Sequence, residues 1–389
     1  SSSLVQKSYS PNFPGEFGGG VINLTTSAVP KESYLTFSAG VGGNSETTTS
    51  MGYVHYGAKT DWTGFDNGTR NTPTALAAYF ASGERINNGG INTQAIASGM
   101  VTWRNGLIQR WDSVAPNWSG TISGGTSFEL GDDLTLGVIA TAGYSNKWQT
   151  RNATQQFSGS ADVSSVDSSF QRVTTDNRIV VNGLLGLGLE FGDNKIRWTN
   201  LYIRDTLKNT RLGLGQRNQT TTDVMQQDTA WYERQLMDTQ LVGEFKLTPE
   251  LNVDLRGGYA NSQREAPSEL TVEYVRTNVA SDPYGAYFVN RLDGNRGDAE
   301  IAYSDLNEDL YSFGADVSYR PIPDMSVSAG YAYQNTKRTS ARRAFQFRAP
   351  GNFPAGPDML RPDFLLSPGL IDGSKIGLIE DDTNPAFGA

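Results

Sequence analysis

Apolar and polar residues alternate with a period of two along most of the chain. In one run the apolar positions are Leu251, Val253, Leu255, Gly257 and Tyr259. The positions between them are Asn252, Asp254, Arg256 and Gly258. Side chains of a β-strand point alternately to its two faces, so this pattern predicts strands with one apolar and one polar face.

Four clusters of turn-forming residues each join two alternating runs. The clusters lie at residues 131–133, 192–194, 248–250 and 321–324. Gly, Asp, Asn and Pro supply the backbone angles that tight connections need, so each cluster predicts a hairpin between two antiparallel strands. The runs that they join cover residues 118–130, 134–144, 179–191, 196–203, 241–247, 251–259, 310–320 and 325–333.

The length of these runs favours one class of β-protein. They last about 10 to 14 residues and several end in an aromatic residue, whereas strands of soluble sandwiches usually have about 5 to 6 residues. A strand of a membrane barrel needs about 9 to 11 tilted residues and has aromatic residues at both interfaces. We therefore predict an all-β fold, an antiparallel transmembrane β-barrel of which this chain holds about ten or more strands. A large soluble all-β domain is the alternative.

Long polar connections separate the predicted hairpins. They cover residues 150–176, 205–229, 261–305 and 336 to the end. Outer-membrane barrels combine short periplasmic turns with long extracellular loops, so the four tight turns are expected at the periplasmic rim. The opposite placement of the turns follows if residues 34–41 form a strand that runs toward the cell exterior and residues 47–56 form a strand that returns to the periplasm. The next strand, which begins at Trp118, then starts in the periplasm, and the turn at 131–133 is extracellular.

The stretch between Ala58 and Pro116 leaves the strand count open. One extra strand there would restore the periplasmic position of the turns, and residues 99–109 are the only candidate, with a weak alternation. Residues 74–82 follow Pro73 and predict a short helix instead.

Composition excludes several kinds of chemistry. The chain of 389 residues has no Cys and a single histidine, His55, so thiol catalysis, disulfide scaffolds, zinc sites and iron–sulfur sites are not expected. The formal charge of −9 argues against a nucleic-acid partner. No run approaches the ~18 apolar residues of a membrane-spanning helix. We find no nucleophile, phosphate-loop or metalloprotease motif, and therefore expect neither an enzyme nor a cofactor.

A glycine-rich motif near the N-terminus differs from the alternating runs. It consists of Gly15, Glu16, Phe17, Gly18, Gly19, Gly20, Val21, Ile22 and Asn23, followed by Leu24, Thr25 and Thr26. This motif resembles the closing strand of the plug domain in TonB-dependent outer-membrane receptors. The first barrel strand follows directly in that family and matches residues 34–41. Residues 61–70, with the sequence DWTGFDNGTR, are also similar to a segment in one branch of these receptors.

The resemblance implies a domain organisation and a function. Residues 1–30 would be the C-terminal end of the plug, and residues 31–389 the N-terminal part of a barrel that has 22 strands in the family. The chain would then be a fragment with about half of the barrel. The family imports a scarce solute, such as a siderophore, cobalamin, oligosaccharide or peptide, with energy from the TonB complex. The implied partners are outer-membrane lipid and lipopolysaccharide, and the location is the outer membrane of a Gram-negative bacterium.

Aromatic and basic residues in the predicted loops are the candidates for binding the solute. They combine rings for stacking with charges that attract an anion. The candidates are Trp148, Phe157, Arg211, Arg217, Trp231, Tyr232, Tyr284 and Tyr287. Each has a second interpretation, as an interfacial aromatic, a lumen charge or a lipopolysaccharide contact. Two other functions remain open: a passive porin or autotransporter barrel, and a secreted β-rich carbohydrate-binding protein.

Overall fold

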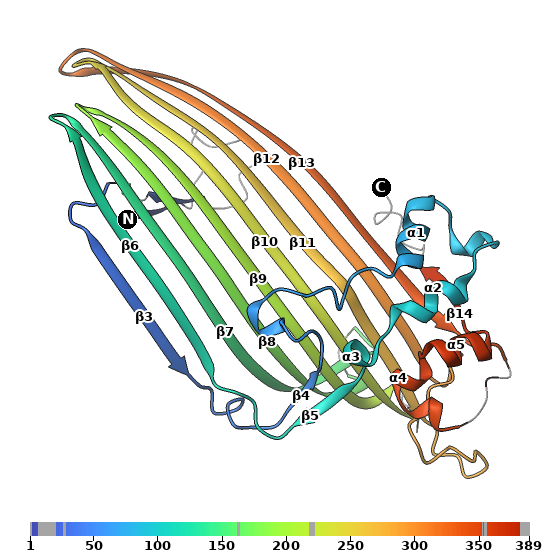
Figure 1. The fold of residues 1–389 in the computed structure, drawn as a ribbon. Coiled ribbons are helices and arrows are strands. Elements are labelled where there is room, and N and C mark those ends of the chain that lie inside the picture. Colours follow the sequence, from blue (N-terminus) through green and yellow to red (C-terminus); the bar gives the residue numbers. More distant parts are fainter. Residues whose placement is uncertain are drawn as a thin grey trace.

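A computed structural model shows a large antiparallel β-structure with a helical cover (Figure 1). It describes the backbone of β1 (Ser2–Gln6) and β2 (Val21–Thr25), and residues 29–161, 164–217, 222–351, 353 and 356–381. Strands β1 and β2 pair antiparallel, with Val5 opposite Ile22. The first six residues of the glycine-rich motif, Gly15 to Gly20, lie outside the described residues.

Ten strands form one sheet in which every neighbouring pair is antiparallel. From one edge to the other the strands are β3 (Tyr34–Gly42), β6 (Asn117–Gly131), β7 (Leu134–Ser158), β8 (Val166–Phe191), β9 (Asn194–Arg217), β10 (Asp223–Thr248), β11 (Leu251–Arg276), β12 (Asp298–Ile322), β13 (Met325–Arg348) and β14 (Gly377–Asp381). All four predicted hairpins are confirmed. Their turns lie together at the upper left of Figure 1, which we call the turn end of the sheet; the opposite end is the far end.

The first sheet strand, β3, pairs directly with β6. No strand of the ten-stranded sheet therefore lies between them, and this answers the question of the strand count between Ala58 and Pro116. Tyr34 lies opposite Gly125, so β3 starts at the turn end and β6 returns to it. Residues 43–116 form one insertion between these two strands. The expectation that residues 47–56 return as a strand of the sheet is wrong, because β4 (Gly52–His55) pairs only with β5 (Ile108–Trp111) in a separate small sheet.

The insertion also holds short helices. The predicted helix at 74–82 is confirmed as α1 (Thr74–Ser82), and it ends at Gly83, whose positive φ of 69° suits glycine. Residues 99–109 do not form a strand of the ten-stranded sheet, because they contain the end of α2, all of α3 and the first two residues of β5. The remaining helical elements of the insertion are η1 (Asp61–Thr63), η2 (Ile86–Asn88), α2 (Thr93–Met100) and α3 (Trp103–Gly106).

Strands β7 to β13 are about twice as long as the sequence predicted, with 24 to 26 residues each. Most of the segments expected as extracellular loops, 150–176 and 205–229 among them, are strand. In 150–176 and 205–229 the apolar alternation is weak because both faces carry many polar side chains, while the backbone ladder continues. Of these segments, two long connections remain: one between Arg276 and Asp298 and one between Arg348 and Gly377.

Helices cover one face of the sheet at its far end (Figure 1). The insertion contributes α1 and α2, and the segment after β13 contributes η3 (Pro357–Leu360), α4 (Pro362–Leu365) and α5 (Pro368–Ser374). They enclose a core with strand residues that include Leu270, Tyr274, Ile301 and Phe345. Among the described residues, no helix has the length and apolar character needed to span a membrane.

Candidate functional site

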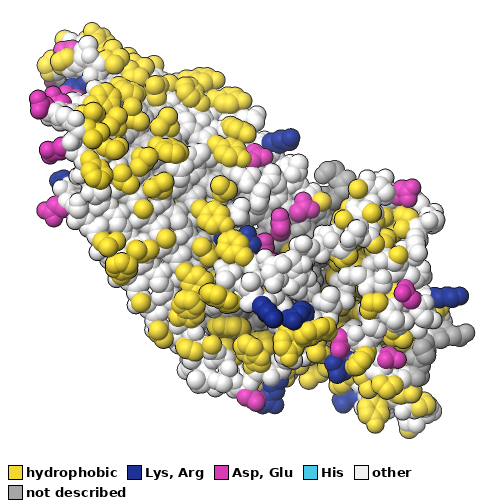
Figure 2. All heavy atoms as spheres, in the orientation of Figure 1, with side chains coloured by type: hydrophobic (Ala, Val, Ile, Leu, Met, Phe, Trp, Pro, Cys, Tyr) yellow, Lys and Arg dark blue, Asp and Glu magenta, His cyan; other side chains and the backbone are white. Residues whose placement is uncertain are grey.

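The sheet has an apolar face and a polar face. Directly paired residues of neighbouring strands share a face, and Val138, Leu187, Trp198 and Leu241 are paired in one continuous row. Figure 2 shows hydrophobic side chains spread over this face in the half nearest the turns. We call this surface the apolar band. It includes Ile122, Phe128, Leu136, Val138, Leu185, Leu187, Leu189, Ile196, Trp198, Met237, Leu241, Leu255, Phe313, Val317, Tyr331 and Tyr333.

Aromatic residues border the apolar band on both sides. Tyr144, Tyr202, Tyr259 and Tyr311 form the far row. Phe128, Phe191, Phe245 and Tyr319 form the near row, beside the turns. On β12 the two rows enclose the nine positions from Tyr311 to Tyr319, which matches the ~9 to 11 residues of a tilted membrane strand. The band is open, since no helix or second sheet of the described chain packs on it.

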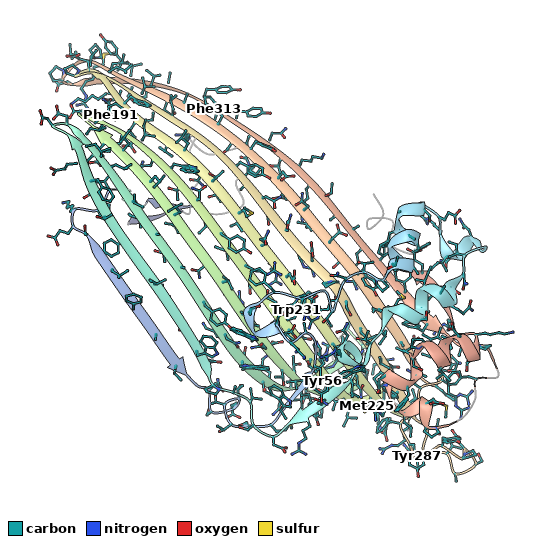
Figure 3. All side chains as sticks on the ribbon, viewed as in Figure 1. Tyr56, Phe191, Met225, Trp231, Tyr287 and Phe313 are labelled. Carbon is teal, nitrogen blue, oxygen red and sulfur yellow. The ribbon has the colours of Figure 1, made fainter. Side chains whose placement is uncertain are left out.

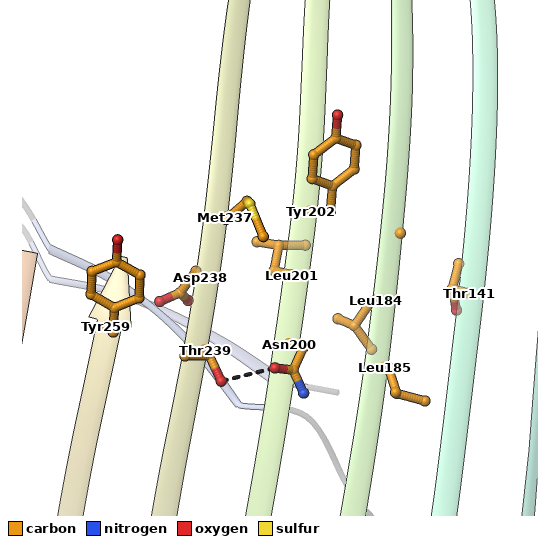
Figure 4. A pocket seen from close by; sticks show the side chains of 11 residues that line it. Thr141, Leu184, Leu185, Asn200, Leu201, Tyr202, Met237, Asp238, Thr239 and Tyr259 are labelled. Atoms are coloured by element: carbon orange, nitrogen blue, oxygen red, sulfur yellow. Dashed lines mark hydrogen bonds between the residues drawn. The ribbon is translucent and has the colours of Figure 1, made fainter. Parts of the chain in front are cut away.

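A shallow groove of about 360 Å³ runs across the apolar band (Figure 4). Gly183 has no side chain to fill it, and Leu185, Met237 and Tyr259 form its apolar walls. Two of its polar groups contact each other: the Thr239 hydroxyl lies 2.8 Å from Asn200 Oδ1, and it also accepts a hydrogen bond of 2.9 Å from the indole nitrogen of the nearby Trp198. The groove therefore offers mainly apolar surface.

The opposite face carries ion pairs over its whole length. Near the turns, Lys195 lies 3.4 Å from Glu190 and Arg256 lies 2.6 Å from Asp316. Beyond the apolar band the pairs become denser. They are Arg178–Asp205 at 2.6 Å, Arg234–Asp205 at 3.6 Å, Arg211–Asp228 at 2.6 Å, Arg342–Glu269 at 2.7 Å and the contact of Arg217 with Glu273. This face is suited to water and to polar solutes.

The chain that leads into β3 lies over the polar face. Val29 lines a small cavity with Gly188, Glu190 and Arg197. A Cβ placed on Gly125, which also belongs to the polar face, would lie 3.0 Å from Pro30 Cγ. The segment that follows β2 therefore approaches the sheet from its polar side.

The structure separates the eight candidate ligand residues into three groups. Phe157, Arg211, Arg217 and Tyr232 lie on the polar face, Trp148 and Trp231 lie on the opposite face, and Tyr284 and Tyr287 lie in the loop between β11 and β12. The expectation that all eight are loop residues is therefore wrong for the first six, which are strand residues. Figure 3 shows Trp231 under the insertion and Tyr287 at the distant loop tip.

Their environments differ as well. Trp231 is only 1% exposed, and the Arg70 guanidinium lies 4.0 Å from the centre of its ring, so this side chain is structural. Tyr232 donates a hydrogen bond of 3.1 Å to Glu269 on the polar face. Burial and the neighbouring Glu269 carboxylate raise the pKa of Tyr232 to about 12, so its hydroxyl remains a donor at neutral pH.

Residues 61–70, for which the sequence indicated no structural role, attach the insertion to the sheet. Arg70 forms two 2.8 Å hydrogen bonds with Asp61 and one of 2.6 Å with Asp66. Lys208 of β9 reaches Asp61 at 2.8 Å. The backbone carbonyl of Gly64 accepts hydrogen bonds from Arg204 Nε at 2.7 Å and from the Thr206 hydroxyl. We call this arrangement the insertion clamp.

Glycine is required at position 64 of the clamp. Its φ of 81° lies in the left-handed region that other residues rarely adopt. A Cβ there would also lie 3.2 Å from Ile179 of β8. The buried charges of the clamp are paired, and this is the condition under which burial of charge is tolerated.

His55 belongs to the same buried region. It is 3% exposed, and its Nδ1 lies 2.8 Å from the Thr210 hydroxyl. Burial lowers the pKa of His55 well below its usual value, and the positive charges of Lys208 and Arg70 lower it further. Burial also lowers the pKa of Lys208, against the opposing effect of Asp61. His55 is therefore a neutral packing residue.

The described residues contain no group of three or more His, Cys, Asp or Glu side chains placed to hold a metal ion. No family model, curated protein or solved structure matches the chain. The features that bear on function are therefore the two chemically different faces of the sheet and the insertion clamp.

Proposed function

We propose that this chain is part of an outer-membrane β-barrel receptor that imports a scarce solute with energy from the TonB complex. In this proposal the apolar band faces lipid and the polar face lines the lumen. The sheet closes into a barrel with further strands at its two edges, β3 and the turn-end half of β13. The solute remains one of a siderophore, a cobalamin, an oligosaccharide or a peptide.

One observation carries the proposal: the apolar band covers a single face, has the length of a tilted membrane strand and is bordered by two aromatic rows. A large continuous apolar surface that is exposed on a protein marks contact with a membrane or a partner. The polar reverse face agrees with a water-filled or plugged lumen. A secreted β-rich protein is disfavoured, because such a protein would bury Leu136 and Val138 against a second sheet.

A receptor with a plug is favoured over a passive porin or autotransporter barrel. Val29 and Pro30 lie over the polar face, as expected if the preceding β2 belongs to a plug inside the lumen. The four polar-face candidates, Phe157, Arg211, Arg217 and Tyr232, then line the outer part of the lumen. They are our proposed ligand contacts, with outer-membrane lipid and lipopolysaccharide as the partners of the opposite face.

The proposal is tested in a Gram-negative bacterium that expresses the full-length parent. Outer-membrane fractionation comes first, because a receptor must be found there and require detergent for extraction. Uptake of a labelled ferric siderophore, cyanocobalamin and a maltooligosaccharide is then measured with and without an uncoupler of the proton gradient. We expect one solute to accumulate only while the gradient is intact. Uptake that continues after uncoupling would identify a passive pore.

A further inference from the structure

The far aromatic row has a gap at β8. Tyr144 of β7 lies opposite Val181 of β8, and Val181 lies opposite Arg204 of β9. The aromatic residue of β9, Tyr202, lies two residues nearer to the turn end than Arg204. Strand β8 has no aromatic residue at this level, so the sheet itself leaves a gap in the row.

The start of the insertion clamp crosses this gap. The Tyr144 hydroxyl donates a hydrogen bond to the backbone carbonyl of Trp62. Two residues later, the Gly64 carbonyl is bound by Arg204 and Thr206 of β9. Residues 62–64 therefore run from β7 across β8 to β9, directly beyond the edge of the apolar band.

The aromatic side chains of this segment face solvent although its backbone is held firmly. Trp62 is 59% exposed and Phe65 is 40% exposed, while Asp61 between the clamp's ion pairs is buried. The guanidinium of Arg204 lies 4.3 Å from the centre of the Phe65 ring. Large aromatic residues that are rigidly placed and exposed beside an apolar surface are typical of membrane interfaces, where one side of the ring contacts acyl chains and the other contacts water.

We propose that the insertion clamp rests on the membrane and that Trp62 and Phe65 insert into the headgroup region of the outer leaflet, where they complete the far aromatic row. This inference rests on the proposed membrane-spanning role of the apolar band. It adds a lipid-binding surface outside the strands, contributed by an insertion rather than by the barrel wall. The clamp's buried ion pairs then have a function: they hold two aromatic residues at a defined height.

The chain has no cysteine, which permits depth measurements with single labels. Trp62→Cys, Leu185→Cys and Tyr56→Cys are made in the full-length parent, freed of any other cysteine, and each is labelled with an environment-sensitive fluorophore. Leu185 lies in the apolar band. Tyr56 is the matched control, because it is exposed on the same insertion but its carbonyl binds Lys208, four residues farther along β9 than Arg204.

The labelled proteins are reconstituted into phosphatidylcholine vesicles whose lipids carry bromine at a shallow or a deep acyl position. We expect the label at 62 to lose about half of its fluorescence with shallow bromine, because the ring would lie at the headgroup–acyl boundary. The label at 185 should respond to deep bromine, and the label at 56 to neither.

The outcomes separate the two proposals. A quenched label at 185 with an unquenched label at 62 would overturn the lipid-binding role of the clamp and leave the barrel intact. An unquenched label at 185 would contradict the membrane-spanning role itself. Trypsin resistance of the insertion checks that each variant is folded. If Trp62→Cys fails this check, Phe65→Cys provides the second position that the proposal places in the headgroup region, with the same expected quenching.

Discussion

Replacing Leu185 with arginine tests whether the apolar face of the sheet contacts lipid or water. Leu185 lies on β8, six residues from Phe191 at the turn end, and is 41% exposed. At about 3.3 Å per residue it lies ~20 Å along the strand, or about 14 Å in depth for a tilt near 45°, close to the middle of a ~25 Å apolar layer. An arginine at that depth costs about 2 to 4 kcal/mol when the side chain faces lipid.

The neighbouring residue is a matched control. Leu184 lies at the same depth but points to the polar face, opposite Thr141 and Leu201. An arginine there extends toward water and polar groups, so we expect less than about 1 kcal/mol of destabilisation. The cost of about 2 to 4 kcal/mol for Leu185→Arg corresponds to about a 30- to 1000-fold change in the folding equilibrium.

The assay follows folding of the protein into phosphatidylcholine vesicles at increasing urea concentration. Tryptophan fluorescence and electrophoretic mobility without boiling report the folded fraction, and the midpoints are compared between variants. We expect Leu185→Arg to unfold at much lower urea than Leu184→Arg. Equal midpoints, or a larger effect of Leu184→Arg, would refute the assignment of the two faces.

Three further predictions concern the insertion and the sheet edges. Arg70→Met should lower the free energy of local unfolding of the insertion by about 3 to 5 kcal/mol, because it leaves Asp61 buried with Lys208 as its remaining charged partner. Hydrogen exchange at residues 61–70 should become faster in this variant. Exchange unchanged from the wild type would contradict the prediction. The lowered pKa of His55 means that the unfolded insertion binds more protons than the folded one below pH ~6.5, so its protection should fall as pH decreases from 6.5. His55→Gln should flatten this dependence, and an unchanged pH profile in that variant would argue against it. Without detergent the chain should sediment as aggregates, because β3 and residues 325–343 of β13 are unpaired edges among the described strands; a monomer in plain buffer would be the opposite result.

The parts of the fold that sequence predicted well depend on local information. The alternation at residues 251–259 and 179–191 and the turn residues beside them define strands, faces and hairpins without knowledge of distant contacts. The helix at 74–82 is similarly local, since Pro73 precedes it and Gly83 ends it. In each case a few neighbouring residues carry the whole signal.

The candidate site was predicted less well, because side chains adjacent in sequence point in opposite directions. Trp231 and Tyr232 were grouped as ligand residues, yet the first is buried under Arg70 and the second lies on the polar face. The polar strand extensions were missed for a related reason. In β9 beyond Arg204 the strand is held by its paired neighbours and by ion pairs such as Arg211–Asp228, which leave no apolar alternation in the sequence.

The sequence by itself determined the local character of this protein: antiparallel strands, their two unlike faces, four tight turns and a chain without cysteine. Only the tertiary structure decided how residues 43–116 are used. Asp61 and Arg70 are nine positions apart, but their partners Lys208 and Trp231 follow more than 130 residues later. A pairing across that distance depends on strand register, and strand register is decided by the whole sheet rather than by any short segment of it.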